Sequence, residues 1–246
     1  AIGAKTSGAI TVTNAIDISG TASELTAALV TDDTLVVAGT ATANITDEAT
    51  TDIDATVLSA IGAKTSGAIT VTNAIDIAGT ADEVTAALVT DDTLVVASSA
   101  TVTISDNPSI SALNAIAAKT DGVVTATLAA DSLSNLGALT TAGTDLITIT
   151  VNDGATDDVT AANLSTLGGK TAGVVTVSNA VDISGTASEL TAALVTADTL
   201  VVAETATANI TDEATTDIDA TVLSAIGAKT SGQVTVTNAI DIAGTA

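Results

Sequence analysis

Residues 60–77 read AIGAKTSGAITVTNAIDI, and the same 18 letters occupy residues 1–18. The stretch returns at 225–242 with two changes, as AIGAKTSGQVTVTNAIDI. Ala60 thus corresponds to Ala1, at a repeat offset of 59, and Ala225 corresponds to Ala60, at a repeat offset of 165. Self-similarity at a fixed spacing is typical of repeat proteins, in which each repeat packs only against its neighbours. The repeat is therefore the feature that decides the architecture.

Two other stretches recur at the longer of these offsets. Residues 19–38 return at 184–203 with one change, and residues 44–67 return at 209–232 with none. The chain also ends inside the motif with which it begins. We therefore expect residues 1–246 to form a single continuous domain that is a window on a longer tandem array.

A shorter period lies within these copies. A Thr-x-Thr element, once Thr-x-Ser, occurs nine times, and most copies are followed by an apolar position and an Asp. This pattern indicates about nine coils of ~28 residues. The elements are Thr11/Thr13, Thr40/Thr42, Thr70/Thr72, Thr101/Thr103, Thr125/Thr127, Thr148/Thr150, Thr176/Ser178, Thr205/Thr207 and Thr235/Thr237.

The pattern within one coil predicts strands joined by a short helical turn. Residues 69–72 alternate aliphatic and threonine side chains, as a half-buried strand requires. The segment ASELTAALV at 22–30 predicts one or two helical turns with a capped N-terminus. So small a unit buries a core only when it stacks on its neighbours. The sequence therefore predicts an all-β fold with short helical turns, a right-handed parallel β-solenoid of about nine coils.

Three other folds fit the pattern less well. A tandem of immunoglobulin-like domains needs a repeat of about 100 residues. A leucine-rich repeat needs a ladder of Leu and Asn that this chain lacks. Cross-β stacking is opposed by the charges and glycines.

The composition excludes several classes of function. The 246 residues include 29 acidic side chains and five basic ones, all lysine, and the formal charge is −24. Without histidine or cysteine the usual nucleophile–base pairs cannot form, so we expect neither an enzyme nor an organic cofactor. Without arginine or aromatic residues, nucleic acid is excluded as a partner. No run of 18 apolar residues occurs, so membrane insertion is not expected.

All five lysines lie in one motif, AKTSG or a close relative. The coils between them carry acids instead, so we expect each lysine to lie between aspartates and to fix the register of the stack. A contact of these lysines with a neighbouring molecule is the alternative. The lysines are Lys5, Lys64, Lys119, Lys170 and Lys229, and the acids are Asp32, Asp33, Asp91, Asp92, Asp145 and Asp198.

Repeated carboxylates form the candidate metal site. Oxygen-rich sites favour Ca²⁺, which would also offset the net charge. Diffuse screening by Na⁺ or Mg²⁺ is the alternative, since neither an EF-hand loop nor a calcium-binding nonapeptide is present. The candidates are one cluster, Asp47, Glu48, Asp52 and Asp54; its copy, Asp212, Glu213, Asp217 and Asp219; and the repeated Asp17, Asp76, Asp182 and Asp241.

The composition and the repeat style resemble those of bacterial surface-layer proteins and giant tandem-repeat surface proteins, including adhesins. This resemblance covers the whole chain but includes no diagnostic motif. It implies a secreted, extracellular or cell-surface location, a structural or adhesive role, and often a dependence on Ca²⁺.

The leading hypothesis is a structural segment of an extracellular filament, surface layer or stalk, which supplies length and stiffness. We expect it to associate with itself, head-to-tail or laterally, with a cell-surface polysaccharide as a further candidate partner. The alternative is an adhesive or ice-binding module that uses the outward Thr-x-Thr or Asp face.

Overall fold

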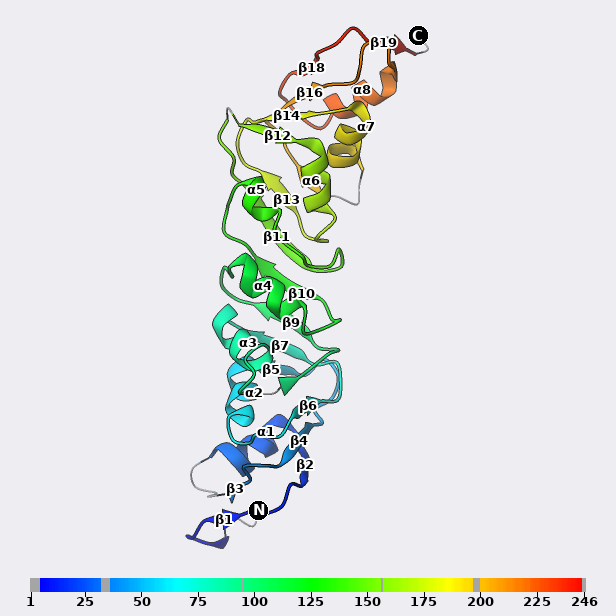
Figure 1. Cartoon of the computed structure of the whole chain (residues 1–246). Helices are drawn as coiled ribbons and strands as arrows, with labels where there is room; N and C mark the ends of the chain where they lie inside the picture. Colours follow the sequence, from blue (N-terminus) through cyan, green and yellow to red (C-terminus); the bar gives the residue numbers. More distant parts are fainter. Residues whose placement is uncertain (1–4, 32–35, 94, 156, 197–199, 245–246) are drawn as a thin grey trace. The chain divides into compact units, whose positions relative to one another are not determined.

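The computed structural model describes residues 5–31, 36–93, 95–155, 157–196 and 200–244. Its contacts divide the chain into two compact units, Ala1–Ala126 and Thr127–Ala246. In both units short strands alternate with short helices along the chain (Figure 1). Each unit is described separately below.

Unit 1 contains four helices, one π-helical segment and ten strands among its described residues, the last strand ending one residue beyond the unit. The elements are β1 (Ile10–Thr11), β2 (Asp17–Gly20), α1 (Ala22–Leu25), η2 (Thr26–Val30), β3 (Val36–Val37), β4 (Thr42–Ile45), β5 (Asp52–Asp54), α2 (Ala55–Gly62), β6 (Ile69–Val71), β7 (Asp76–Gly79), α3 (Ala81–Leu88), β8 (Val95–Val96), β9 (Thr101–Ile104), α4 (Ile110–Ala117) and β10 (Val124–Thr127).

Unit 2 repeats this alternation. Its elements, as far as the structure describes them, are α5 (Leu133–Leu136), β11 (Leu146–Val151), β12 (Asp158–Thr160), α6 (Ala161–Gly168), β13 (Val175–Val177), β14 (Asp182–Gly185), α7 (Ala187–Leu190), η4 (Thr191–Val195), β15 (Val201–Val202), β16 (Thr207–Ile210), β17 (Asp217–Asp219), α8 (Ala220–Gly227), β18 (Val234–Val236) and β19 (Asp241–Ala243).

Strands pair in parallel with strands about one repeat away. In unit 1 one sheet has the order β2-β4-β6-β8, and β5, β7, β9 and β10 follow one another in a second. In unit 2 the corresponding orders are β12-β14-β16-β18 and β11-β13-β15. Consecutive strands such as β6 and β7 belong to different sheets, so each repeat contributes strands to more than one sheet of its unit.

The predicted all-β class is wrong. The chain is α/β, and its described residues form eight helices and 19 strands, with 27% of the residues helical. Five of the helices have eight residues, about two turns, as in α2 and α3, so short helices are a regular part of the fold. Alanine and leucine are strong helix formers. The side chain of Asp54 caps the first turn of α2, and that of Thr80 caps the first turn of α3, so both segments form helices rather than strands. The prediction of an all-β, right-handed parallel β-solenoid of about nine coils is therefore wrong.

The predicted period of about 28 residues is also longer than the interval at which strands pair. Register partners lie closer together in the sequence, as in Val102 with Val124 and Ile69 with Val95. Because the Thr-x-Thr elements recur at a longer interval, most of them do not pair with another Thr-x-Thr element on the adjacent strand. Thr70, for example, pairs with Asn44 on one side and Val96 on the other.

Burial of the aliphatic core depends on neighbours. Ile16 and Ile75 occupy the same place in two identical copies of the sequence. Ile75, with paired strands on both sides, is fully buried, whereas Ile16 is 43% exposed. A repeat therefore completes its core only when repeats stack on both of its faces.

Candidate functional site

The lysine-containing motif connects adjacent repeats through its threonine and glycine. The hydroxyl of Thr65 donates to the carbonyl oxygen of Ala41 and accepts from the N–H of Gly67, 3.0 Å away. A Cβ on Gly67 would overlap that same carbonyl group. Only glycine therefore permits this close approach of two backbones. The same trio recurs as Thr120, Gly122 and Ala100; Thr171, Gly173 and Ile147; and Thr230, Gly232 and Ala206.

The lysines of the motif lie at the surface of the repeat. Lys64 and Lys119 are exposed, and backbone N–H groups of the turns that follow them donate to the carbonyl oxygens of Gly39 and Ser98. The equivalent N–H groups after Lys170 and Lys229 donate to the backbone carbonyl oxygens of Asp145 and Glu204. The buried Asp145 uses its carboxylate within its own turn, where it accepts from the N–H of Ala142 at 2.9 Å. The predicted partners Asp32, Asp33 and Asp198 lie outside the described residues.

Four of the repeated aspartates cap a helix of the neighbouring repeat. Oδ2 of Asp47 accepts from the N–H of Ala22 at 2.6 Å, and Ala22 is the first residue of α1. A free first-turn N–H and the positive end of the helix dipole both favour a carboxylate there. The equivalent contacts, each of 2.7 Å, join Asp106 to Ala81, Asp153 to Leu133 and Asp212 to Ala187.

Another group of these aspartates lies on strands, where threonine hydroxyls donate to them. Asp17 accepts from Thr42, Asp76 from Thr101 and Asp182 from Thr207. Asp241 stands at the same place in β19, where it is exposed. In each of the three contacts the threonine belongs to the next strand of the sheet, so the carboxylate bonds one repeat to another.

Asp54 and Asp219 cap their own helices. Hydrogen bonds from the hydroxyl and the N–H of Thr56 hold the pKa of Asp54 below its usual value. The N–H and the hydroxyl of Thr221 do the same for the pKa of Asp219. Both carboxylates are therefore ionised at neutral pH, as an N-cap acceptor should be.

Some carboxylates lie next to one another on adjacent strands. Asp52 is the register partner of Asp76, and Asp217 is the register partner of Asp241. Glu48 and its copy Glu213 are exposed. Their backbone carbonyl oxygens accept from the hydroxyls of Thr51 and Thr216.

Two equivalent open grooves contain part of the predicted metal cluster. One has a volume of about 520 Å³ and includes Asp47, Asp52 and Asp54; the other has about 540 Å³ and includes their copies Asp212, Asp217 and Asp219. Within the ranges that the structure describes, no three acidic side chains approach closely enough to hold a metal ion. The calcium site thus stays a prediction, and the contacts shown for several of these carboxylates are to protein groups.

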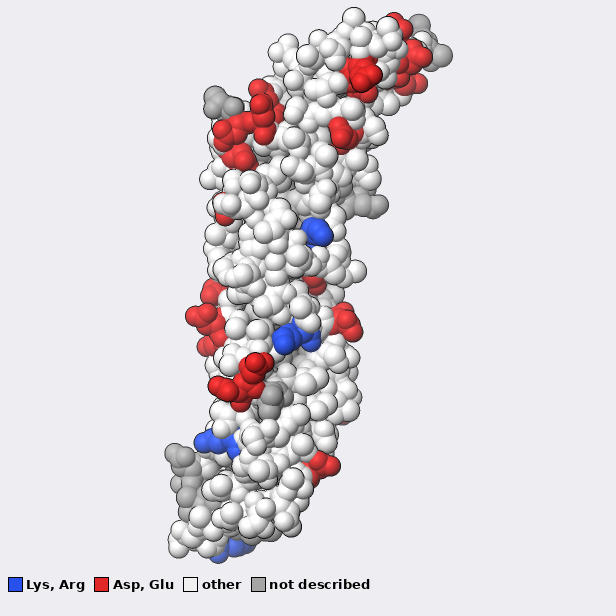
Figure 2. All heavy atoms as spheres, viewed as in Figure 1, with Lys and Arg blue, Asp and Glu red and all other residues white. Residues whose placement is uncertain are grey.

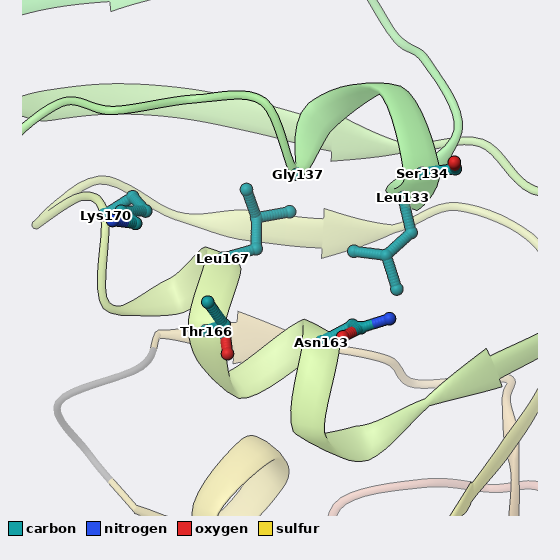
Figure 3. Close-up of a pocket in the computed structure, with 7 residues that line it drawn as sticks. All are labelled: Leu133, Ser134, Gly137, Asn163, Thr166, Leu167 and Lys170. Carbon is teal, nitrogen blue, oxygen red and sulfur yellow. The ribbon is translucent and has the colours of Figure 1, made fainter.

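A smaller pocket of about 320 Å³ lies between α5 and α6 (Figure 3). Leu133 and Leu167 extend their side chains into it, and Lys170 and Asn163 lie at its edges. It forms where α5 has only four residues against eight in α6. Its lining offers an amine, an amide and hydroxyl groups but no carboxylate, so it lacks an acid–base pair.

The threonine and glycine contacts were missed by the sequence analysis, although a signal was present. In the five copies of the motif the residue between them varies among Ser, Asp and Ala, whereas Thr and Gly never vary. The sequence analysis considered the lysine of the motif because of its charge, but the constant Thr and Gly form the contact with the adjacent repeat.

No protein-family model, curated protein or solved structure matches the chain. Within the described parts of the chain, no helix has the length and apolar character needed to cross a membrane.

Proposed function

We propose that the chain is a structural repeat segment of an extracellular fibre, surface layer or stalk, which provides length and stiffness through stacked repeats. One observation carries this proposal: identical sequences are buried or exposed according to whether they have neighbours, as Ile75 and Ile16 show. Such a unit gains its stability from stacking, so further repeats can extend it with little change in local structure.

The contacts between repeats support the same function. Thr65 with Ala41, Asp47 with Ala22, and Thr42 with Asp17 are all hydrogen-bonded pairs between adjacent repeats, and each recurs elsewhere in the chain. Their number should grow in step with the number of repeats. This is the behaviour required of a spacer whose length is set by duplication.

The alternative of an ice-binding threonine face is not adopted. Among the register pairs within each unit, Thr-x-Thr residues meet directly at Thr103 with Thr125 and at Thr150 with Thr176. Elsewhere Asn, Val or Asp interrupts the columns, as beside Thr70 and Thr101.

The test is to lengthen the chain by inserting further copies of residues 19–77, one full period of the sequence. Because register partners such as Asp17 and Thr42 are less than half a period apart, each copy adds slightly more than two strand steps. Four copies should therefore add at least about 38 Å to the maximum dimension measured by small-angle X-ray scattering. The matched control carries valine in place of Gly67 in every inserted copy, which blocks the close approach between repeats. The proposal is contradicted if the maximum dimension grows no more regularly with the number of copies when the copies carry Gly67 than when they carry valine there.

A further inference from the structure

The lysine motif belongs to a longer segment that occurs four times in the chain. The four lysine segments are residues 1–18, 60–77, 166–183 and 225–242. Each of the first three is followed by a second kind of segment, and these covering segments are residues 19–45, 78–104 and 184–210. Within residues 1–246, the fourth lysine segment is followed by only the first four residues of another covering segment.

Each covering segment pairs with its lysine segment in the same register. On one strand a threonine pairs with a valine of the covering segment, and on the next an aspartate pairs with a threonine whose hydroxyl donates to it. The first pairs are Thr11 with Val37, Thr70 with Val96 and Thr176 with Val202. The second pairs are Asp17 with Thr42, Asp76 with Thr101 and Asp182 with Thr207. The structure therefore shows three times which surface a lysine segment binds.

The fourth lysine segment keeps the matching face open. Its strands β18 and β19 are the last of their sheets, so in the described part of the chain no strand lies at their outer edges. Ile242 is 59% exposed, whereas Ile77, at the same place in the second lysine segment, is 1% exposed. Val236 is 36% exposed, against 8% for its equivalent Val71. Open strand edges beside uncovered aliphatic side chains are suited to the addition of a further strand.

The first and the fourth lysine segments each lack the neighbour that the other has. The first is paired with its covering segment through β3 and β4, but β1 and β2 are at the edges of their sheets. The fourth is paired with the preceding repeat through β16 and β17 and has no covering segment among the described residues. A lysine segment with both neighbours, such as residues 60–77, buries its aliphatic side chains on both faces.

We propose that two molecules of this chain join head-to-tail by exchange: the fourth lysine segment of one displaces the first lysine segment of the other from its covering segment. The two segments differ at only two positions, so the same register places Thr235 beside Val37 and Asp241 beside Thr42. Exchange replaces one set of strand contacts by an equal set and leaves the incoming segment covered on both faces, which favours joining. The contact is heterologous, so it can continue from molecule to molecule. It names the partner of the proposed structural segment and rests on that function for its biological setting.

The charge of the chain opposes this contact and sets the conditions of the test. Figure 2 shows acidic side chains grouped around the C-terminal end of unit 2, and each molecule carries a charge of −24. Joining should therefore be weak at low ionic strength and strengthen as salt screens the repulsion. The incoming Asp241 meets a donor, since the hydroxyl of Thr42 already donates to Asp17 at the equivalent place.

The experiment links two full-length variants through cysteines, since the chain has no cysteine of its own. Thr235→Cys and Val37→Cys are mixed under oxidising conditions in about 1 M NaCl, which screens charges beyond about 3 Å. Val96→Cys is the matched control for Val37→Cys. Val96 is 52% exposed against 54% for Val37, but it pairs with Thr70, whose lysine segment has neighbours on both faces. The disulfide from Thr235→Cys to Val37→Cys should form at least about fivefold faster than that to Val96→Cys, with mass spectrometry identifying the linked positions.

Two further substitutions in the Thr235→Cys variant test whether the open face of β19 makes the contact. Ile242→Asp places a carboxylate where joining would bury it, as Ile77 is buried, and should slow the disulfide about tenfold or more. Ala243→Asp is its control, because Ala78 at the equivalent place stays exposed, and should change the rate less than about twofold. Ile242 and Ala243 are exposed in the single chain, and far-UV circular dichroism checks that each variant is folded.

Equal rates for Val37→Cys and Val96→Cys overturn the proposal, as do equal rates for the two aspartate variants. Links between two molecules of the Thr235→Cys variant, in excess of links to Val37→Cys, would show a tail-to-tail contact and overturn it as well. Regular lengthening by inserted repeats without the link to Val37→Cys would reject the exchange but keep the structural function. The link without regular lengthening would do the reverse.

Discussion

Gly67 lies at one of the close approaches between two repeats, and its replacement by alanine tests whether that approach stabilises the fold. The added Cβ would overlap the carbonyl of Ala41, so the backbones must separate and the bond from Thr65 must lengthen. We expect Gly67→Ala to lower the free energy of unfolding by about 1–3 kcal/mol, as overpacking does. Urea denaturation followed by far-UV circular dichroism measures this loss.

The control for this substitution is Gly39→Ala in the adjacent repeat. A Cβ on Gly39 has no atom within 4 Å, so the same change should alter stability by less than about 0.5 kcal/mol. Equal losses in the two variants would show that the close approach at Gly67 contributes nothing particular.

At the scale of elements, the start of α1 depends on a residue of the next repeat. Thr21 and Glu24 form a local capping box, while Asp47 satisfies the N–H of Ala22 from 25 residues away. Asp47→Ala leaves that N–H without its acceptor and should cost about 1–2 kcal/mol of unfolding free energy. Glu48→Ala, next to it and exposed, should cost almost nothing. A similar loss in both variants, by chemical denaturation, would reject the capping role.

The N-cap aspartates of α2 and α8 make the free energy of unfolding depend on pH. The pKa values of Asp54 and Asp219 are lowered in the folded chain by bonds from Thr56 and Thr221. The unfolded chain therefore takes up these protons at a higher pH than the folded one. Their contribution is complete above the unfolded pKa of about 4 and is lost as pH falls below it.

We expect the free energy of unfolding to decrease below about pH 4, and to decrease less steeply in a double variant with Asp54→Asn and Asp219→Asn. Denaturant titrations at a series of pH values would measure both slopes. Identical slopes for the wild type and the double variant would show that these caps do not respond to pH.

The helices also show why the sequence was a partial guide at this scale. The alternation in residues 69–72 marks a true strand, β6, because period two is visible even over a few residues. The segment at 55–62 contains the aliphatic residues Val57, Leu58 and Ile61, whose spacing is too short to separate a helix from a buried strand. The cap that decides the outcome, Asp54 with Thr56, was assigned to a metal cluster instead. Contacts between residues far apart in the sequence, such as Asp47 with Ala22, have no local signal.

At the scale of the whole molecule, the exact copies made the repeat visible, but the pairing interval could not be read from them. The first copy begins at Ala1 and the second at Ala60, whereas register partners such as Asp17 and Thr42 are less than half as far apart. One full period is longer than two steps of the sheet, because the counterpart of β2 in the next copy is β7, which lies in a different sheet from β2, β4 and β6. The Thr-x-Thr elements are not register partners in most cases, as Thr70 with Asn44 and Val96 shows, so their spacing suggested coils of ~28 residues that the structure does not contain.

The net charge of −24 leads to the last prediction, which concerns cations. Several candidate calcium ligands already accept bonds from the protein, as Asp47 does from Ala22, Asp54 from Thr56 and Asp76 from Thr101. The fold therefore needs screening of its surface charge more than a specific ion. We expect the far-UV circular dichroism of the folded chain to persist in chelator at about 0.15 M NaCl, a moderate ionic strength. Stability should rise with salt, and Ca²⁺ and Mg²⁺ should act alike at equal ionic strength. If instead the folded spectrum appears only with Ca²⁺, the acidic residues form true folding sites and the predicted calcium dependence is restored.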